Sequence, residues 1–248
     1  MLLPVKVGFA EYMKGYFEYL KTINNITAET KSLADFILRD VGKCIVWCPT
    51  RMVDQANEML GAWQRNDTDS AATTPYKLPV IAIAFGGGYM PTGRDYSRRI
   101  TVPQAIILDN DVKERVFKIT TSVSDVLTQI VFFTNDPTTV YELAESFVNY
   151  VDNAQFFNAK YIFAGLEHEF PVQVESPEFP VELVDSGVKN ICINAVRLNW
   201  HVTEPHFYHP KDNEPNDGKG TDGDINDLHG YPVITGITGV DTMQRQII

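Results

Sequence analysis

The sequence has few cysteines, no long apolar run and a deficit of positive charge. Its three cysteines, Cys44, Cys48 and Cys192, are too few and too odd in number for a disulfide framework. No apolar run approaches the roughly 20 residues of a membrane-spanning helix. The N-terminus also lacks the basic, apolar and small-residue segments of a signal peptide. We therefore expect a soluble protein, made in a reducing cytosol, with no membrane partner.

The shortage of basic residues restricts the class of partner. A formal net charge of −11 argues against nonspecific binding to DNA, RNA or anionic membranes, which a basic face would favour. The same charge is compatible with a protein past which DNA slides without being held. The length of 248 residues and a hydrophobic content of 44% suit a globular domain with appendages.

Motifs that carry chemistry are absent or incomplete. The segment 88–95 follows an expected strand, as a phosphate-binding loop does. That loop needs a Lys and a Ser or Thr at its end, and Arg94 and Asp95 occupy those positions here. Asp222, Asp224 and Asn226 have the spacing of a calcium loop, but its later glycine and glutamate are missing, so a solvated acidic segment is favoured.

Three histidines lie close together in the sequence, at positions 201, 206 and 209. Pro205 and Pro210 bracket the last two, so no helix presents them together as metalloproteases require. Cys44 and Cys48 do not form a zinc or redox motif, and buried structural thiols are favoured. The sequence also contains no nucleophile elbow and no dinucleotide fingerprint. It predicts no catalytic residue, no cofactor and no metal site, and hence a protein that is not an enzyme.

The clearest structural unit spans residues 114–152. Two β-rich runs, 116–123 and 127–134, predict two strands, the second of them covered on both faces. Asp136 and Pro137 then have the composition of a helix start. Apolar residues follow at helical spacing, and they are Val140, Leu143, Ala144, Phe147, Val148 and Val151. The prediction is strand, strand, and an amphipathic helix lying on the sheet.

The other expected elements are shorter. They are helices over 8–24, 31–40 and 51–64, strands over 43–49 and 188–202, and a strand over 80–85 that Gly86–Gly88 end. From Pro205 to residue 230 the composition favours a long loop or a disordered arm. The fold class is therefore α/β (α+β), a mixed or antiparallel sheet flanked by two or three amphipathic helices. One domain spans 1–210, and an irregular acidic C-terminal arm spans 211–248.

Some residues are candidates for a protein interface. The helix 8–24 has an aromatic face that includes Tyr12 and Tyr16, which suits either an interface or the protein's own core. Trp63 and Trp200 are further aromatic candidates. Basic candidates are Arg94, Arg98 and Arg99, which either pair with acidic loops of a neighbouring subunit or are ordinary surface charge.

The order of these elements resembles the tail terminator, or tail sheath stabiliser and completion, proteins of contractile-tailed bacteriophages. Four segments between residues 43 and 209 carry the resemblance. They are KCIVWCPTRMVDQANEML, KLPVIAIAF with the loop GGGYMPTGR, VFKITTSVSDVLTQIVFFTNDPTTVYELAESFVNYV, and VRLNWHVTEPHFY. The third is the most specific, because the family has a strand, a second β-rich strand and an acid-capped helix there. The arm after Pro210 has no counterpart that can be aligned.

This resemblance implies a virion structural protein at the junction of tail and neck, made in the cytoplasm of a bacterial host. Its subunits would form a homo-oligomeric ring, a hexamer in this family, that caps the tail tube, anchors the sheath and joins the neck or head-completion proteins. Viral DNA would only pass through the lumen. Two alternatives stay open: another neck, tube-end or baseplate protein of the virion, and a soluble enzyme or ligand-binding protein without a recognised motif.

Overall fold

The computed structural model describes residues 3–23, 31–48, 78–91, 100, 102–107, 115–163, 166–175, 181–184 and 191–210. Several predictions fall outside these residues. They concern Arg94, Arg98, Arg99, Trp63, the helix 51–64 and the C-terminal arm 211–248.

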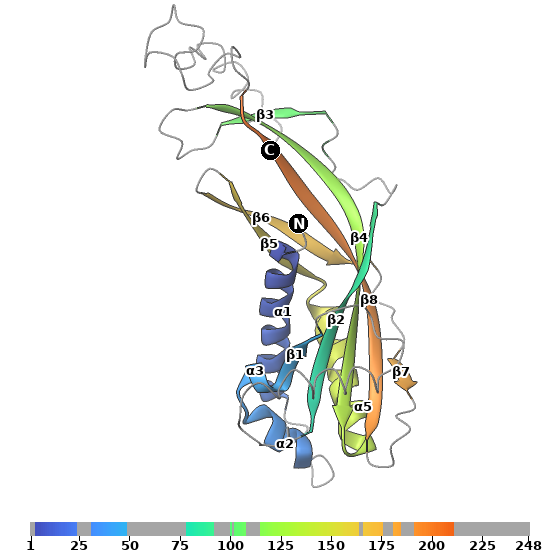
Figure 1. Cartoon of the computed structure of the whole chain (residues 1–248). Helices are drawn as coiled ribbons and strands as arrows, with labels where there is room; N and C mark the ends of the chain where they lie inside the picture. Colours follow the sequence, from blue (N-terminus) through green and yellow to red (C-terminus); the bar gives the residue numbers. More distant parts are fainter. Residues whose placement is uncertain are drawn as a thin grey trace, which may run out of the picture. The chain divides into compact units, whose positions relative to one another are not determined.

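Among the described residues, three helices come first along the chain, followed by four strands, one helix and four further strands (Figure 1). The helices are α1 (Leu3–Thr22), α2 (Lys31–Ile37), α3 (Val41–Cys44) and α5 (Pro137–Asn153). The strands are β1 (Ile45–Trp47), β2 (Val80–Pro91), β3 (Gln104–Ile107), β4 (Val116–Thr134), β5 (Phe156–Phe163), β6 (Leu166–Val174), β7 (Val181–Val184) and β8 (Cys192–Tyr208).

The strands form one mixed sheet in the order β1-β2-β4-β8-β6-β5, with β3 paired to β4 and β7 paired to β8. β1 is parallel to β2, whereas β2 and β3 are antiparallel to β4, and β6 and β7 are antiparallel to β8. The predicted fold class is confirmed. No helix in the described part of the chain is long and apolar enough to cross a membrane.

The contacts divide the chain into two compact units. Unit 1 comprises Met1–Arg94, Val123–Lys160 and Glu169–Thr203, and unit 2 comprises Asp95–Ser122, Tyr161–His168 and Glu204–Ile248. β4, β5, β6 and β8 contribute residues to both units. The boundaries among the described residues fall within β4, β5, β6 and β8, where no linker composition marks them in the sequence.

β4 is a single strand of 19 residues, so the prediction of two strands in this segment is wrong (Figure 1). The burial pattern explains why the sequence suggests two. Odd-numbered residues are buried from Phe117 to Val123, and even-numbered residues are buried from Ser124 onward, so the buried face changes between them. From Thr128 to Thr134 both faces are buried, as predicted. The periodicity is interrupted, but the hydrogen-bonded strand continues.

β2 is also longer than predicted. It runs through Gly86–Gly88 to Pro91, and its register against β4 shifts between Phe85 and Tyr89. Glycine is common at an irregularity of this kind, since the extra residues of β2 must be accommodated without a clashing β-carbon. The glycines therefore mark a bulge rather than the predicted strand end.

The start of α5 is confirmed. Asp136 is the N-cap, and its side chain accepts a hydrogen bond from the Thr139 backbone N–H at 2.6 Å, while Pro137 occupies the first turn. The Ser32 hydroxyl lies 2.5 Å from the second carboxylate oxygen of Asp136, so the cap also ties α2 to α5. The buried face includes five of the predicted residues, which are Val140, Leu143, Ala144, Phe147 and Val151.

The N-terminal elements differ in detail from the prediction. α1 begins at Leu3, earlier than the expected helix 8–24. The expected helix 31–40 ends at Ile37, and the expected strand 43–49 is reduced to β1 because α3 includes Cys44. The Asp40 carboxylate accepts a hydrogen bond from the Gly42 N–H at 2.8 Å, and this cap stabilises a helical turn where β-prone residues suggested a strand.

β8 extends beyond Pro205, so the loop predicted from that position starts too early. In the described pairing, β6 meets β8 only from Trp200 to Val202. A proline, which has no N–H, is tolerated in a strand where one side is unpaired. The composition of residues 205–208 suggested a loop, because composition does not show which strands a segment pairs with in the folded sheet.

Core side chains occupy both faces of the sheet in unit 1. On one face Phe132 contacts Phe147 of α5, with ring centroids 5.8 Å apart. The adjacent residue, Phe133, points to the other face, into a cluster with five further members, which are Ala82, Ala84, Val131, Ile193 and Ala195.

Candidate functional site

The aromatic face of α1 lies in the core of unit 1. Tyr12 is 6% exposed and Tyr16 is fully buried. Their hydroxyls donate hydrogen bonds to the carbonyl oxygens of Ala154 and Leu143, each at 2.7 Å. Burial is the main cause that raises the pKa of both phenols. These two tyrosines are therefore wrong as interface candidates, and the core reading of the aromatic face is confirmed.

Trp200 is likewise a core residue, 1% exposed, and not an interface anchor. Its indole N–H donates to the Thr128 hydroxyl oxygen at 2.9 Å. Its ring contacts Phe9, Tyr12 and Phe157 at centroid distances of 5.1 to 5.5 Å. Large aromatic side chains are enriched in interfaces and in cores alike, so the residue type alone does not distinguish the two.

Two glycines of α1 allow this close packing, and the sequence analysis did not single them out. A β-carbon at Gly8 would clash with the carbonyl oxygen of Asn158, and one at Gly15 would lie 2.5 Å from the Tyr150 hydroxyl oxygen. The two positions are one heptad apart on a helix, and this spacing is the only sequence signal of the contact.

The cysteines behave as structural thiols where they are buried. Cys44 is fully buried, and burial raises the pKa of its thiol to about 11 against a smaller opposing effect of Arg39. Burial also raises the pKa of the Cys48 thiol to about 11. Neither thiol is ionised near neutral pH, so neither is an activated nucleophile.

The histidines of β8 contact β4 rather than one another. The His201 ring nitrogen Nδ1 lies 2.7 Å from a carboxylate oxygen of Asp125, in unit 1, and both side chains are largely buried. In unit 2, the His206 nitrogen Nε2 lies 2.8 Å from the Ser122 hydroxyl oxygen. The His209 ring packs against Phe163 at 5.1 Å. The residues that the structure describes contain no group of three His, Cys, Asp or Glu side chains suited to a metal ion.

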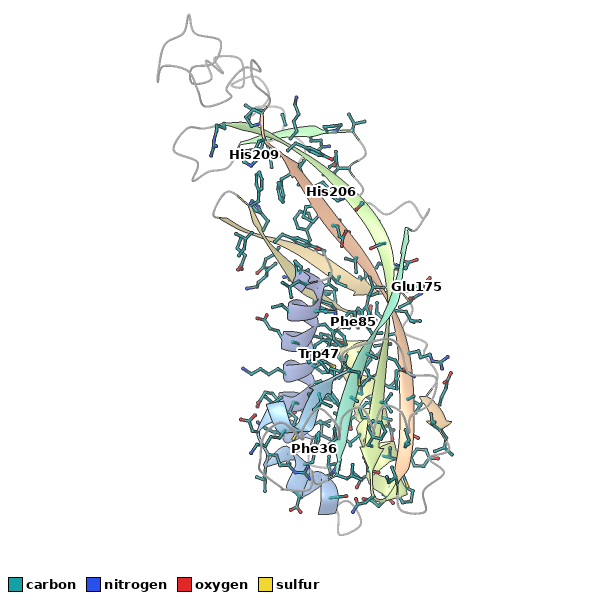
Figure 2. The ribbon with its side chains drawn as sticks, in the orientation of Figure 1. Phe36, Trp47, Phe85, Glu175, His206 and His209 are labelled. Carbon is teal, nitrogen blue, oxygen red and sulfur yellow. The ribbon has the colours of Figure 1, made fainter. Side chains whose placement is uncertain are left out.

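The Ser122–His206 contact belongs to a row of polar side chains on β4 and β8 within unit 2. Thr120 and Ser122 alternate with buried residues on β4, and the Thr120 hydroxyl donates to the Tyr208 hydroxyl oxygen at 3.3 Å. Because side chains two residues apart share a face, Glu204 lies in the same row as His206 and Tyr208 on β8. Figure 2 labels His206 on this part of β8. We refer to these five residues as the polar row.

The polar row contains groups of different chemistry and exposure. Ser122 and His206 are half-buried, Tyr208 is 50% exposed, and Glu204 is 4% exposed. The row therefore places a hydroxyl, an imidazole, a carboxylate and a phenol along two adjacent strands. Sequence reasoning considered His206 only as a metal ligand, because its pairing with Ser122, 84 positions away, depends on strand register.

An aromatic group at the edge of the sheet is the second notable feature. Trp47 stacks on Phe85 with ring centroids 5.5 Å apart, and Figure 2 shows the two side chains close together. Phe9 meets both rings edge-on. The Lys6 ammonium lies 5.7 Å from the Phe85 centroid. Because Trp47 is 39% exposed, this group is partly accessible from solvent.

Comparison with known proteins identifies no family for this chain. No family model matches it, and no curated protein matches it at a significant level of similarity. The resemblance to phage tail terminators therefore stays a prediction.

Proposed function

We propose that this protein is a non-enzymatic virion component, a tail terminator of a contractile-tailed bacteriophage. In this role its subunits form a ring, a hexamer by the family resemblance, that caps the tail tube, anchors the sheath and contacts the neck. The observation that carries the proposal is the acid-capped helix of the most family-like segment, which here follows one long strand where the family has two. There β4 leads through the Asp136 cap into α5, whose apolar face covers a mixed sheet.

Exposed apolar side chains at the margins of the sheet support a homo-oligomer. Among the described strands, β5 ends the sheet order and β7 pairs only with β8. Phe156 and Ile162 of β5 are 63% and 80% exposed, and Leu183 of β7 is 70% exposed. Exposed apolar residues next to unpaired strand edges are a liability in a monomer, and a neighbouring subunit removes it. These residues replace Tyr12, Tyr16 and Trp200 as interface candidates.

Native mass spectrometry with negative-stain imaging tests the proposal, first on the purified protein and then with purified tail tubes. Rings with a central hole, or rings that form on tube ends, are the expected result. Subunits that remain monomeric at every concentration and ignore both tube and sheath would overturn it. If rings form but bind the baseplate end, the alternative of another virion component is favoured, because only position in the particle separates the two.

Single substitutions test the exposed apolar residues of β5 and β7, which we call the margin residues. Leu183→Glu and Ile162→Glu place a charge at a position that an interface would bury, so we expect ring formation to be lost in at least one variant while the thermal midpoint of unfolding is retained. Leu38→Glu is the matched control, because Leu38 is 84% exposed and follows α2 rather than the margin of the sheet. Rings that form normally in both margin variants would exclude these strands from the interface.

The Ser122–His206 contact favours one alternative, a ligand-binding protein or an enzyme. A thermal-shift screen with nucleotides and divalent metals distinguishes this class, because a ligand that binds only the folded state raises the unfolding midpoint. A shift that grows with ligand concentration, together with an absence of rings, would favour the alternative over the assembly role.

A further inference from the structure

The polar row of unit 2 contains a hydroxyl and an imidazole in the arrangement of a nucleophile and its base. The Ser122 oxygen lies 2.8 Å from Nε2 of His206. This is within the hydrogen-bond reach of about 2.6–3.2 Å that proton transfer from a nucleophile to a general base requires. Both side chains are half-buried, so neither is enclosed in the core.

Two further residues of the polar row, Glu204 and Tyr208, have side chains whose chemistry suits acyl transfer. Glu204 precedes His206 by two residues on the same face of β8, and it is 4% exposed. A carboxylate on the same face of the strand favours, through its negative charge, the imidazolium that forms when the base takes a proton. Tyr208 follows His206 by two residues on the same face and is half exposed, so its phenol is an accessible hydrogen-bond donor for a developing oxyanion.

We propose that Ser122 is an activated nucleophile that accepts an acyl group from an activated ester, with His206 as its base. The Ser122 oxygen attacks the ester carbonyl carbon, and its proton passes to Nε2 of His206. When the tetrahedral intermediate collapses, the carbon–oxygen bond to the leaving group breaks, and the leaving alcohol takes the proton from His206. The products are an ester on Ser122 and the free alcohol.

This inference goes beyond the proposed assembly role and does not depend on it. A structural subunit that carries a reactive serine is modified at one position, and a ring forms or fails to form irrespective of that reaction. The competing explanation is that the Ser122–His206 contact only ties β4 to β8. A hydrogen bond of that kind needs a donor and an acceptor but no basic nitrogen, so the two explanations differ in what replacing His206 with glutamine does.

The test is labelling of the full-length protein with an alkyl fluorophosphonate. In this reaction the Ser122 oxygen forms a bond to phosphorus, the phosphorus–fluorine bond breaks, fluoride leaves and His206 takes the proton. Intact-mass measurement gives the rate, and tandem mass spectrometry of a digest gives the position. We expect one label per chain, on Ser122, and none in Ser122→Ala.

Two further variants separate chemistry from structure. His206→Gln keeps a hydrogen-bonding side chain but not the base, and we expect its labelling rate to fall by about 100-fold or more, the usual contribution of a general base. Ser124→Ala is the control, because Ser124 is fully buried and its hydroxyl has no partner among the described residues. Circular dichroism and urea unfolding show whether each variant is folded.

The outcomes decide the proposal. Labelling of Ser122 that depends on His206 and not on Ser124 supports it. Labelling spread over several serines, no labelling of the folded wild-type protein, or an unchanged rate in folded His206→Gln would overturn it. If His206→Gln does not fold, a stoichiometric burst of p-nitrophenolate from p-nitrophenyl acetate with the wild-type protein, absent in folded Ser122→Ala, supports the proposal, and the lack of a burst overturns it.

Discussion

Gly15 of α1 and Tyr150 of α5 pack so closely that a β-carbon on Gly15 would lie 2.5 Å from the Tyr150 hydroxyl oxygen. The same hydroxyl donates a hydrogen bond to the Tyr12 carbonyl oxygen at 3.2 Å. The two helices are therefore joined at a point where one helix has no side chain and the other has a tyrosine. The same close approach occurs between Gly8 and β5.

Substitutions at the two glycines should differ in effect. Gly8→Ala is expected to lower the free energy of unfolding, because the obstructing atom is a backbone carbonyl oxygen that cannot move away. Overpacking costs about 1–3 kcal/mol, which exceeds the approximately 1 kcal/mol that alanine gains over glycine in a helix. Urea unfolding measures the difference. A stabilised Gly8→Ala variant would contradict the close contact with β5.

Gly15→Ala meets only the end of a side chain. In the wild-type background we expect a small change, because the gain in helix propensity is offset by displacement of the Tyr150 hydroxyl. In a Tyr150→Phe background the clashing oxygen is gone, and Gly15→Ala should raise the free energy of unfolding by up to about 1 kcal/mol. The two effects form a double-mutant cycle, and an interaction energy of zero would exclude the contact.

Asn194 is a buried polar residue whose replacement should stabilise the protein. It is fully buried on β8, and neither amide atom has a hydrogen-bond partner among the described residues. An unsatisfied buried polar group costs about 1–3 kcal/mol, so Asn194→Leu, which is similar in shape, should raise the free energy of unfolding by an amount in that range. Asn194→Asp, which buries a charge, should lower it. If Asn194→Leu is destabilising instead, a bound water satisfies the amide.

The Asp136 cap should contribute measurably to stability. Asp136→Ala removes the acceptor for the Thr139 N–H and for the Ser32 hydroxyl, and we expect a loss of about 1–2 kcal/mol. Asp136→Asn retains a capping oxygen and should lose less. Thermal unfolding of the three proteins gives the order wild type, Asn variant, Ala variant. Equal midpoints for all three would show that the cap is not needed once α5 has packed.

Buried tyrosines should make the protein sensitive to alkali. Burial raises the pKa of Tyr16 well above 10, whereas the unfolded chain ionises near 10. Below pH 10 both states hold the proton, so the contribution of Tyr16 is fully present. Above pH 10 the unfolded state loses its proton first, and the free energy of unfolding falls by up to about 1.4 kcal/mol per pH unit for this group.

Tyr16→Phe isolates that contribution. At pH 8 the variant should be less stable by about 1 kcal/mol, because the Leu143 carbonyl oxygen loses its donor. Between pH 10 and 11 its stability should fall less steeply than that of the wild type. Urea unfolding at pH 8, 10 and 11 measures both quantities, and equal slopes would mean that Tyr16 ionises in the folded state.

The sequence determined the features that depend on neighbouring residues. Asp136 and Pro137 start a helix when an amphipathic run follows, and the β-rich runs 116–123 and 127–134 favour extended structure. The apolar periodicity also fixed which faces of α1 and α5 are buried, because burying the alternative face would expose the apolar one. These features set the fold class.

Only the tertiary structure decided the features that depend on pairing between distant segments. β3 pairs with residues 116–119 of β4, β2 pairs with residues 124–133, and β8 lies on the other side, so β4 is one strand although its buried face changes at Ser124. Tyr12, Tyr16 and Trp200 are core residues because α1 packs against α5 and β8. No local pattern distinguishes a core aromatic residue from one in an interface. The register between β4 and β8 likewise places the Ser122 hydroxyl within hydrogen-bond distance of the His206 ring. The sequence fixes which side chains each strand presents, but only the packed sheet fixes which of them meet.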